Sequence, residues 1–162
     1  MKGAIRVLFV GVAAGALAGQ AMNKATTWFY EQQSDESKQR EQEVLPEGAP
    51  MASARKLASW IGAEPTDDQT GQLAEAMHRS LGQLYGVVAA SMTRRGVNPV
   101  AAGLASGAGG FLLVDELANS LFFTPPPQAY PVESHLRGVV GHLTFGAALG
   151  VLLAVARRLR LL

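Results

Sequence analysis

Five polar side chains fall inside or beside long apolar stretches of this 162-residue chain. They are His78, Asp115, Glu116, Asn119 and His142. Ionisable groups within a membrane are costly, and they usually face the protein interior and are paired or functional. Histidine titrates near neutral pH, so a histidine beside a carboxylate can exchange a proton with it. These residue types predict a polar cluster that binds or conducts protons or a small solute.

A structural ion pair is the alternative role for the same carboxylates, which would then lock helices together. The candidate partners are Arg79, His135 and Arg137. Histidine and carboxylate are also suitable metal ligands, but no local spacing typical of a metal site accompanies them, so we predict no metal and no cofactor. No nucleophile motif or phosphate-binding loop is present either, and we expect no enzymatic activity and no catalytic residues.

The distribution of charge favours a membrane protein. Ten of the 13 acidic residues lie between Glu31 and Glu75. Residues 3–22 and 138–156 together contain one charge, Arg6. A soluble domain of this size would distribute charged residues over every surface helix. No basic face is available to neutralise phosphates, so we expect no nucleic-acid partner.

Four apolar segments approach the roughly 20 residues that a helix needs to cross a bilayer. They cover residues 3–22, 73–93, 97–123 and 132–156. We therefore predict an all-α fold, a four-helix transmembrane bundle in which residues 1–162 form a single multi-pass domain surrounded by the lipid bilayer. A soluble four-helix bundle is the alternative for the second and third segments. Residues 100–114 argue against a soluble bundle, because a helix formed by them has no polar face that could contact water.

Lysine and arginine residues near the ends of the spans predict the orientation. Seven basic residues at these ends have no acidic residue among them: Lys2, Arg6, Arg94, Arg95, Arg157, Arg158 and Arg160. An even number of spans with cytoplasmic N and C termini satisfies this bias. The first 18 residues also fit a secretory signal, with residues 16–18 as its cleavage site, and cleavage would leave the orientation of the other spans unchanged.

The acid-rich stretch of residues 23–72 is predicted to be an extracytoplasmic loop containing short amphipathic helices. Residues 31–43 are typical of a helix that continues the first span into water, ended by a stretch rich in proline and glycine. Residues 52–61 have the spacing of an amphipathic helix. Thr66 and Gln69 form a capping-box pattern, which predicts the start of the helix that contains the second span.

Small residues recur at four-residue steps in all four predicted spans. The glycines concerned are Gly11, Gly15 and Gly19, then Gly82 and Gly86, then Gly103 and Gly107, and finally Gly138, Gly146 and Gly150. Such stripes let helix backbones approach closely in lipid, so we expect helix interfaces along them. Asp115 and His142 continue these stripes, so the polar residues fall on packing faces. The alternative function is a structural or assembly protein that joins copies of itself or a membrane protein partner through these faces.

Several stretches carry a resemblance to a known family. Residues 130–138, followed by Gly141-His142 and Phe145-Gly146, resemble the closing motif of the YagU-like family of bacterial inner-membrane proteins, a family of unknown function. Residues 28–30, 84–86 and 113–116 are also similar to members of that family, and the resemblance covers most of the chain outside residues 32–64. It implies a multi-pass protein of the bacterial inner (plasma) membrane, with no established substrate, cofactor or catalytic residue.

Overall fold

The chain folds into helices throughout the part that the structure, a computed structural model, describes, residues 2–162. It is 84% helical and has no strand within that range, so the prediction of an all-α fold is confirmed. The elements are α1 (Lys2–Gln32), α2 (Asp35–Val44), α3 (Ala49–Trp60), α4 (Asp67–Arg94), α5 (Pro99–Gly110), the π-helix η1 (Phe111–Ala118), α6 (Asn119–Phe122), the short 3₁₀-helix η2 (Pro127–Ala129) and α7 (Val132–Arg158).

Three helical stretches are long and apolar enough to cross a membrane: Gly3–Gln32, Pro99–Phe122 and Val132–Arg158. Helix α4 is not among them, so the structure supports a membrane protein with three candidate spans and does not by itself establish a four-helix transmembrane bundle. The apolar part of α4, residues 81–93, covers only about 20 Å at 1.5 Å per residue. That is shorter than the roughly 30 Å hydrocarbon core of a bilayer.

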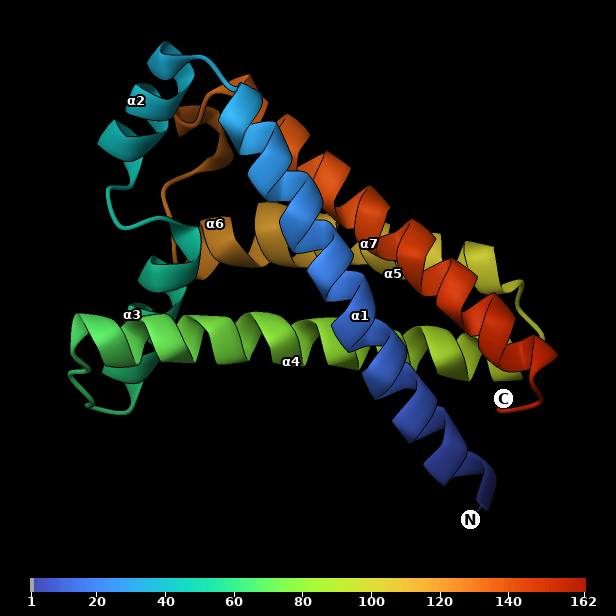
Figure 1. The fold of residues 1–162 in the computed structure, drawn as a ribbon. Coiled ribbons are helices and arrows are strands. Elements are labelled where there is room, and N and C mark those ends of the chain that lie inside the picture. The colour runs from blue at the N-terminus through green and yellow to red at the C-terminus, as the bar shows by residue number, and fades with distance from the viewer. Residues whose placement is uncertain (1) are drawn as a thin grey trace.

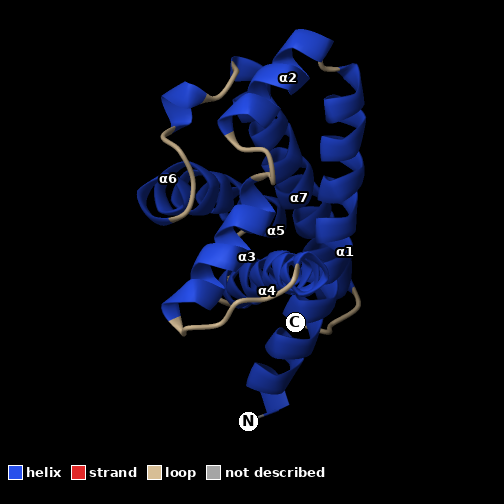
Figure 2. Cartoon of the chain, turned by 90° about the vertical axis from the view of Figure 1, so that its left-hand side faces the viewer, coloured by secondary structure: helices blue, strands red, loops and turns tan. Residues whose placement is uncertain are grey.

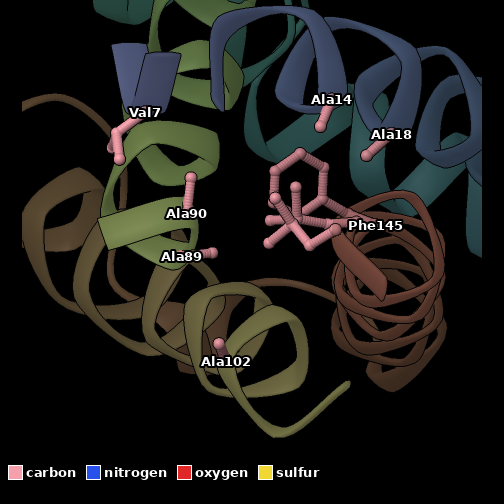
Figure 3. Packing of buried hydrophobic residues seen from close by; sticks show 9 residues of the cluster. Val7, Ala14, Ala18, Ala89, Ala90, Ala102 and Phe145 are labelled. Carbon is pink, nitrogen blue, oxygen red and sulfur yellow. The ribbon is translucent and has the colours of Figure 1, made fainter. Parts of the chain in front are cut away.

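The helices form two crossed layers (Figure 1). Helices α1 and α7 run side by side in opposite directions and cross the second layer, in which α4 lies beside α5. The core lies where the layers cross and is built of small and large side chains together, including Ala14, Ala18, Ala89 and Phe145 (Figure 3). Both termini and the turn between α4 and α5 lie at one end of the molecule (Figure 1).

Glycines form the contact between α1 and α4. A Cβ atom added at Gly86 would lie 2.8 Å from the Cα atom of Gly15 and would also collide with the carbonyl oxygen of Gly11. A Cβ atom at Gly15 would likewise collide with the carbonyl oxygen of Gly82. The two backbones are in direct contact, so even the smallest side chain has no room at this crossing.

The crossing of α5 and α7 is built in the same way. A Cβ atom at Gly103 would lie 2.8 Å from the Cα atom of Gly150 and would collide with the carbonyl oxygen of Gly146. A Cβ atom at Gly107 would collide with the carbonyl oxygen of His142. Backbone contact at these positions brings the polar part of α7 against the third predicted span.

Gly19 departs from the predicted packing stripe on α1. A Cβ atom there would have no neighbour within 4 Å, so the prediction that Gly19 packs closely against another helix is wrong. Helix α1 crosses α4 at an angle, and its C-terminal half diverges from α4 (Figure 1). Farther along, α1 contacts α7 through larger side chains, because Met22 and Thr26 cover Gly141.

The polar loop contains two separate helices, α2 and α3. The predicted continuation of the first span through residues 31–43 is corrected, because the chain bends at Gln33 and Ser34 and begins α2 anew. The Ser34 side chain accepts a hydrogen bond from the Ser37 amide at 3.1 Å, which caps the new helix. The amphipathic helix predicted at residues 52–61 is present as α3.

Helix α4 begins with the predicted capping box. The Thr66 hydroxyl oxygen accepts a hydrogen bond from the Gln69 amide, and the Gln69 side chain accepts one from the Thr66 amide. The Thr70 hydroxyl also donates a bond of 2.8 Å to the Thr66 carbonyl oxygen. These local bonds fix the start of α4, and α3 lies across this end of it (Figures 1 and 2).

Candidate functional site

The third predicted span changes its helical form where its carboxylates lie. Helix α5 ends at Gly110, and residues Phe111–Ala118 form the π-helix η1, which contains both Asp115 and Glu116. In a π-helix each amide bonds to the carbonyl five residues earlier, so an extra residue enters the turn. Such segments are rare and frequently occur at functional sites. The wider turn presents both adjacent carboxylates to α7.

Asp115 pairs with His142 of α7. The Nε2 atom of His142 lies 3.0 Å from Oδ2 of Asp115, and the exposed fractions of the two side chains are 12% and 39%. The ring of Phe111 lies against the imidazole, with 5.9 Å between ring centroids. Gly138 allows this approach, because a Cβ atom there would lie 2.9 Å from the Phe111 ring. The pair therefore joins η1 to α7 beside apolar surface.

Glu116 pairs with His135, two turns of α7 before His142. The Nδ1 atom of His135 lies 2.8 Å from Oε1 of Glu116, and its Nε2 atom lies 3.0 Å from the carbonyl oxygen of Pro127. A carbonyl oxygen and a carboxylate oxygen only accept hydrogen bonds. Both ring nitrogens can donate only in the imidazolium form, so this geometry requires either a charged His135 or a protonated Glu116. Either way, the pair holds one proton beyond a neutral imidazole and a carboxylate.

Two other members of the predicted cluster bond elsewhere. His78 of α4 forms a hydrogen bond with Asn23 of α1, with 3.0 Å between Nε2 and Oδ1. The prediction that Asn119 supports Asp115 is wrong, because the Asn119 side chain accepts a bond of 3.3 Å from Ser53 of α3. The Asn119 side chain therefore bonds to α3 and not to Asp115.

The two arginines predicted as partners of these carboxylates pair with other acids. Arg79 lies 3.6 Å from Glu75, one turn away on the exposed face of α4. Arg137 pairs with Glu41 of α2. It lies two residues after His135, about 200° around the helix at 3.6 residues per turn, so it faces α2 when His135 faces η1. Of the three candidate partners, only His135 contacts a carboxylate of η1.

Arg137 is the centre of a polar network that the sequence did not predict. Its guanidinium nitrogens donate to both carboxylate oxygens of Glu41, at 2.5 and 3.0 Å, and to Oε1 of Gln33 at 2.7 Å. The Ser134 hydroxyl donates a bond of 2.8 Å to Glu41. Tyr30 lies beneath the guanidinium, 5.1 Å from its ring centroid to Cζ. The network joins α1, α2 and α7, and no local spacing could have indicated it because Glu41 and Arg137 are 96 residues apart.

The network changes the acidity of Glu41. Burial by itself would raise the pKa of the Glu41 carboxyl, but hydrogen bonds from Arg137, Ser134 and Gln33 and the charge of Arg137 outweigh it and hold the pKa below its ordinary value of 4.5. Glu41 therefore remains a carboxylate at neutral pH and favours the folded position of α2.

Comparison of the sequence with protein-family models, with curated proteins and with solved structures finds no match. Within residues 2–162, no group of three histidine, aspartate or glutamate side chains is arranged to hold a metal ion. The polar residues between η1 and α7 form two histidine–carboxylate pairs, Asp115 with His142 and Glu116 with His135.

Proposed function

We propose that this protein is a four-span protein of the bacterial inner membrane with both termini in the cytoplasm. Arginines without acidic neighbours lie at the end of the molecule that contains both termini and the α4–α5 turn (Figure 1): Arg6, Arg94, Arg95, Arg157, Arg158 and Arg160. An excess of arginine and lysine marks the cytoplasmic side of membrane proteins. The resemblance to the YagU-like family supports the same location. In this arrangement α4 is the second span and packs against α1 and α5.

Cysteine labelling tests this topology, because the chain has no cysteine of its own. We expect Gln128→Cys to react with a membrane-impermeant thiol reagent in intact spheroplasts and Arg95→Cys to be protected until the membrane is opened. Both side chains are exposed in connections between longer helices, Gln128 in η2 and Arg95 in the α4–α5 turn, so their local accessibility is similar. Labelling of Arg95→Cys in intact cells, or equal labelling of both, would contradict the four-span arrangement.

For the activity, we propose that the protein binds and releases protons through its two histidine–carboxylate pairs, as a module that responds to or conducts protons. The observation that carries this proposal is the geometry of His135, both of whose ring nitrogens lie within 3.0 Å of an oxygen that only accepts. A proton is thus shared between His135 and Glu116. The Asp115–His142 pair lies farther along the same face of α7 and provides a second site for proton exchange.

The histidine signals in nuclear magnetic resonance spectra test this proposal, because the chain has only three histidines and each is assigned by its own His→Gln variant. We expect His135 to change protonation during a pH titration of the folded protein in detergent, and Glu116→Gln to change that titration while leaving the His78 signal unaltered. Asp115→Asn should change the His142 signal and leave the His135 signal unaltered. Glu75→Gln is the matched control, since this carboxylate is exposed and pairs with Arg79.

Thermal unfolding between about pH 5 and 8, where histidine normally titrates, distinguishes proton exchange from a fixed ion pair. The stability contributed by the His135–Glu116 pair is present while the extra proton is bound and is lost as the pH rises and the proton leaves. We expect Glu116→Gln to weaken this pH dependence, and Asp115→Asn, which alters the proposed second pair, to reduce the overall pH dependence separately. Identical pH profiles of wild type and both variants would contradict the proposal and leave a structural role.

The assembly function receives less support from the packing. Its predicted interfaces are the glycine stripes, and Gly86 and Gly103 are already in contact with backbone atoms of the same chain. The stripes are therefore used to hold this bundle together. The proton-binding proposal accounts for the polar residues that these contacts bring to α7.

A further inference from the structure

Helix α3 has one apolar surface, and the protein covers only part of it. Ala54 and Ala58 are buried, and α3 packs on α4. Beside them, Leu57 and Trp60, and Ile61 directly after the helix, are exposed by 37%, 55% and 83%. A helix that faced water here would have polar residues on this part of its surface.

The exposed face is continuous with the surface of a candidate membrane span. The Trp60 ring packs on Phe123, with 5.3 Å between centroids and 33° between ring planes. Phe123 directly follows the candidate span Pro99–Phe122, whose last residues Leu121 and Phe122 are exposed by 63% and 56%. Trp60 therefore lies level with the end of that span, where hydrocarbon gives way to lipid headgroups.

We propose that α3 lies on the membrane surface, with Leu57, Trp60 and Ile61 inserted at the boundary between headgroups and acyl chains of the extracytoplasmic leaflet. Tryptophan is enriched at this depth because its ring is apolar and its indole N–H can bond to polar groups. The polar sequence around the helix suits the same position. Lys56 is exposed toward the headgroup layer, and Gly62, with φ of +73°, turns the chain away from the bilayer directly after Ile61.

The contacts of α3 give this attachment a consequence for the candidate site. Ser53, on its buried side, donates a hydrogen bond of 3.3 Å to Asn119, which begins α6 directly after η1. Helix α3 is thus fixed on one side by lipid and on the other by the segment that follows the carboxylates. In this proposal the polar loop is a membrane-surface element beside the end of the bundle, where α3 lies in front of α4 in Figure 2.

The two tryptophans of the chain allow a direct test. Trp28→Phe leaves Trp60 as the only tryptophan, and Trp60→Phe leaves Trp28, which lies near the end of α1 and serves as the reference. Each variant is reconstituted, at low protein-to-lipid ratio, in phosphatidylcholine–phosphatidylglycerol vesicles that carry bromine either near the headgroup end or near the middle of the acyl chains. We expect shallow bromine to quench Trp60 at least about twofold more than deep bromine, as for an interfacial side chain.

Iodide present on both sides of the vesicles provides the opposing measurement. Iodide should quench Trp60 weakly in vesicles and strongly after detergent-free unfolding in urea. Strong quenching by iodide with none by bromolipid would place α3 in water and overturn the proposal. Protection of Trp60 from both quenchers would indicate a protein surface over α3 and would also overturn it. Flotation of the vesicles with the protein measures membrane insertion separately.

An additional pair of variants tests the neighbouring contact. In the Trp28→Phe background, Ile61→Asp should reduce quenching of Trp60 by shallow bromine about twofold or more, because a carboxylate resists insertion among acyl chains. Ile61→Leu should leave the quenching unchanged. Circular dichroism must show equal helix content in both. Equal quenching in the two variants would remove Ile61 from the inserted face and contradict the proposed contact.

Discussion

Replacing Gly86 by alanine is expected to lower the free energy of unfolding by about 1–3 kcal/mol, the usual cost of overpacking, although alanine is the better helix former. The added methyl group would meet backbone atoms of Gly11 and Gly15, which cannot rotate out of the way as a flexible side chain could. To make room, α1 and α4 must separate, and the contacts beside Gly86 are lost along the crossing. Gly86→Leu and Gly146→Leu should cost more for the same reason.

The controls for this prediction come from the same chain. Gly19→Ala and Gly109→Ala should stabilise the protein or leave it unchanged, because a Cβ atom at either position meets nothing within 4 Å. Leu112→Ile should do little, since Leu112 is 59% exposed. Thermal or denaturant unfolding in detergent, followed by loss of helical circular dichroism, measures all of these variants. If Gly86→Ala and Gly19→Ala unfold at the same temperature or denaturant concentration, the α1–α4 contact is not as close as described.

Arg137→Met is expected to destabilise the position of α2 by up to about 3 kcal/mol, because it leaves the half-buried Glu41 carboxylate without its charged partner. This loss of stability is at the lower end of the range for buried ion pairs. The side chains of Arg137 and Glu41 are exposed by 21% and 22%, so solvent screens part of their interaction. Arg137→Lys should be only partly tolerated, because an ammonium cannot donate in parallel to both carboxylate oxygens. Removing both charges in Arg137→Met with Glu41→Met should restore much of the stability.

The pH dependence of stability provides an independent test of the same network. Because the pKa of Glu41 is lowered in the folded protein, its contribution to stability is fully present above the ordinary value of 4.5 and is lost as the pH falls through the folded pKa. Glu41→Gln should therefore lower stability at neutral pH and remove this part of the acid sensitivity. Limited proteolysis of the α2 region across pH 3 to 7 measures it, and unchanged acid sensitivity in Glu41→Gln would exclude this carboxylate as the cause.

The local features of this protein could be predicted from sequence because each depends on residues within one or two helical turns. The capping bonds between Thr66 and Gln69 need only a helix start, and α3 follows from the amphipathic spacing of residues 52–61. The meeting of Asp115 with His142 was also accessible, since both continue small-residue stripes on facing helices. Apolar length predicted four spans, and three of them are candidate spans in the structure.

The detailed pairing of charges was decided by tertiary structure. A stripe extended by four-residue steps assumes an uninterrupted α-helix, and η1 breaks that assumption at the point where the carboxylates lie. Glu116 pairs with His135, and Asn119 accepts a hydrogen bond from Ser53. The partner of Arg137 required knowledge of where α2 folds back, 96 residues away along the chain.

The physical reason for this division is the range of the interactions. Helix formation, capping and the amphipathic pattern depend on residues about four positions apart, so they can be predicted directly from the sequence. Which helices cross, and at what angle, depends on backbone contact between glycines of distant segments, such as Gly86 with Gly15 and Gly103 with Gly150. Sequence determined that this chain forms apolar helices with small-residue faces and carboxylates within a candidate span. Only the crossing of those helices decided that Glu116 faces His135 and that Arg137 faces Glu41.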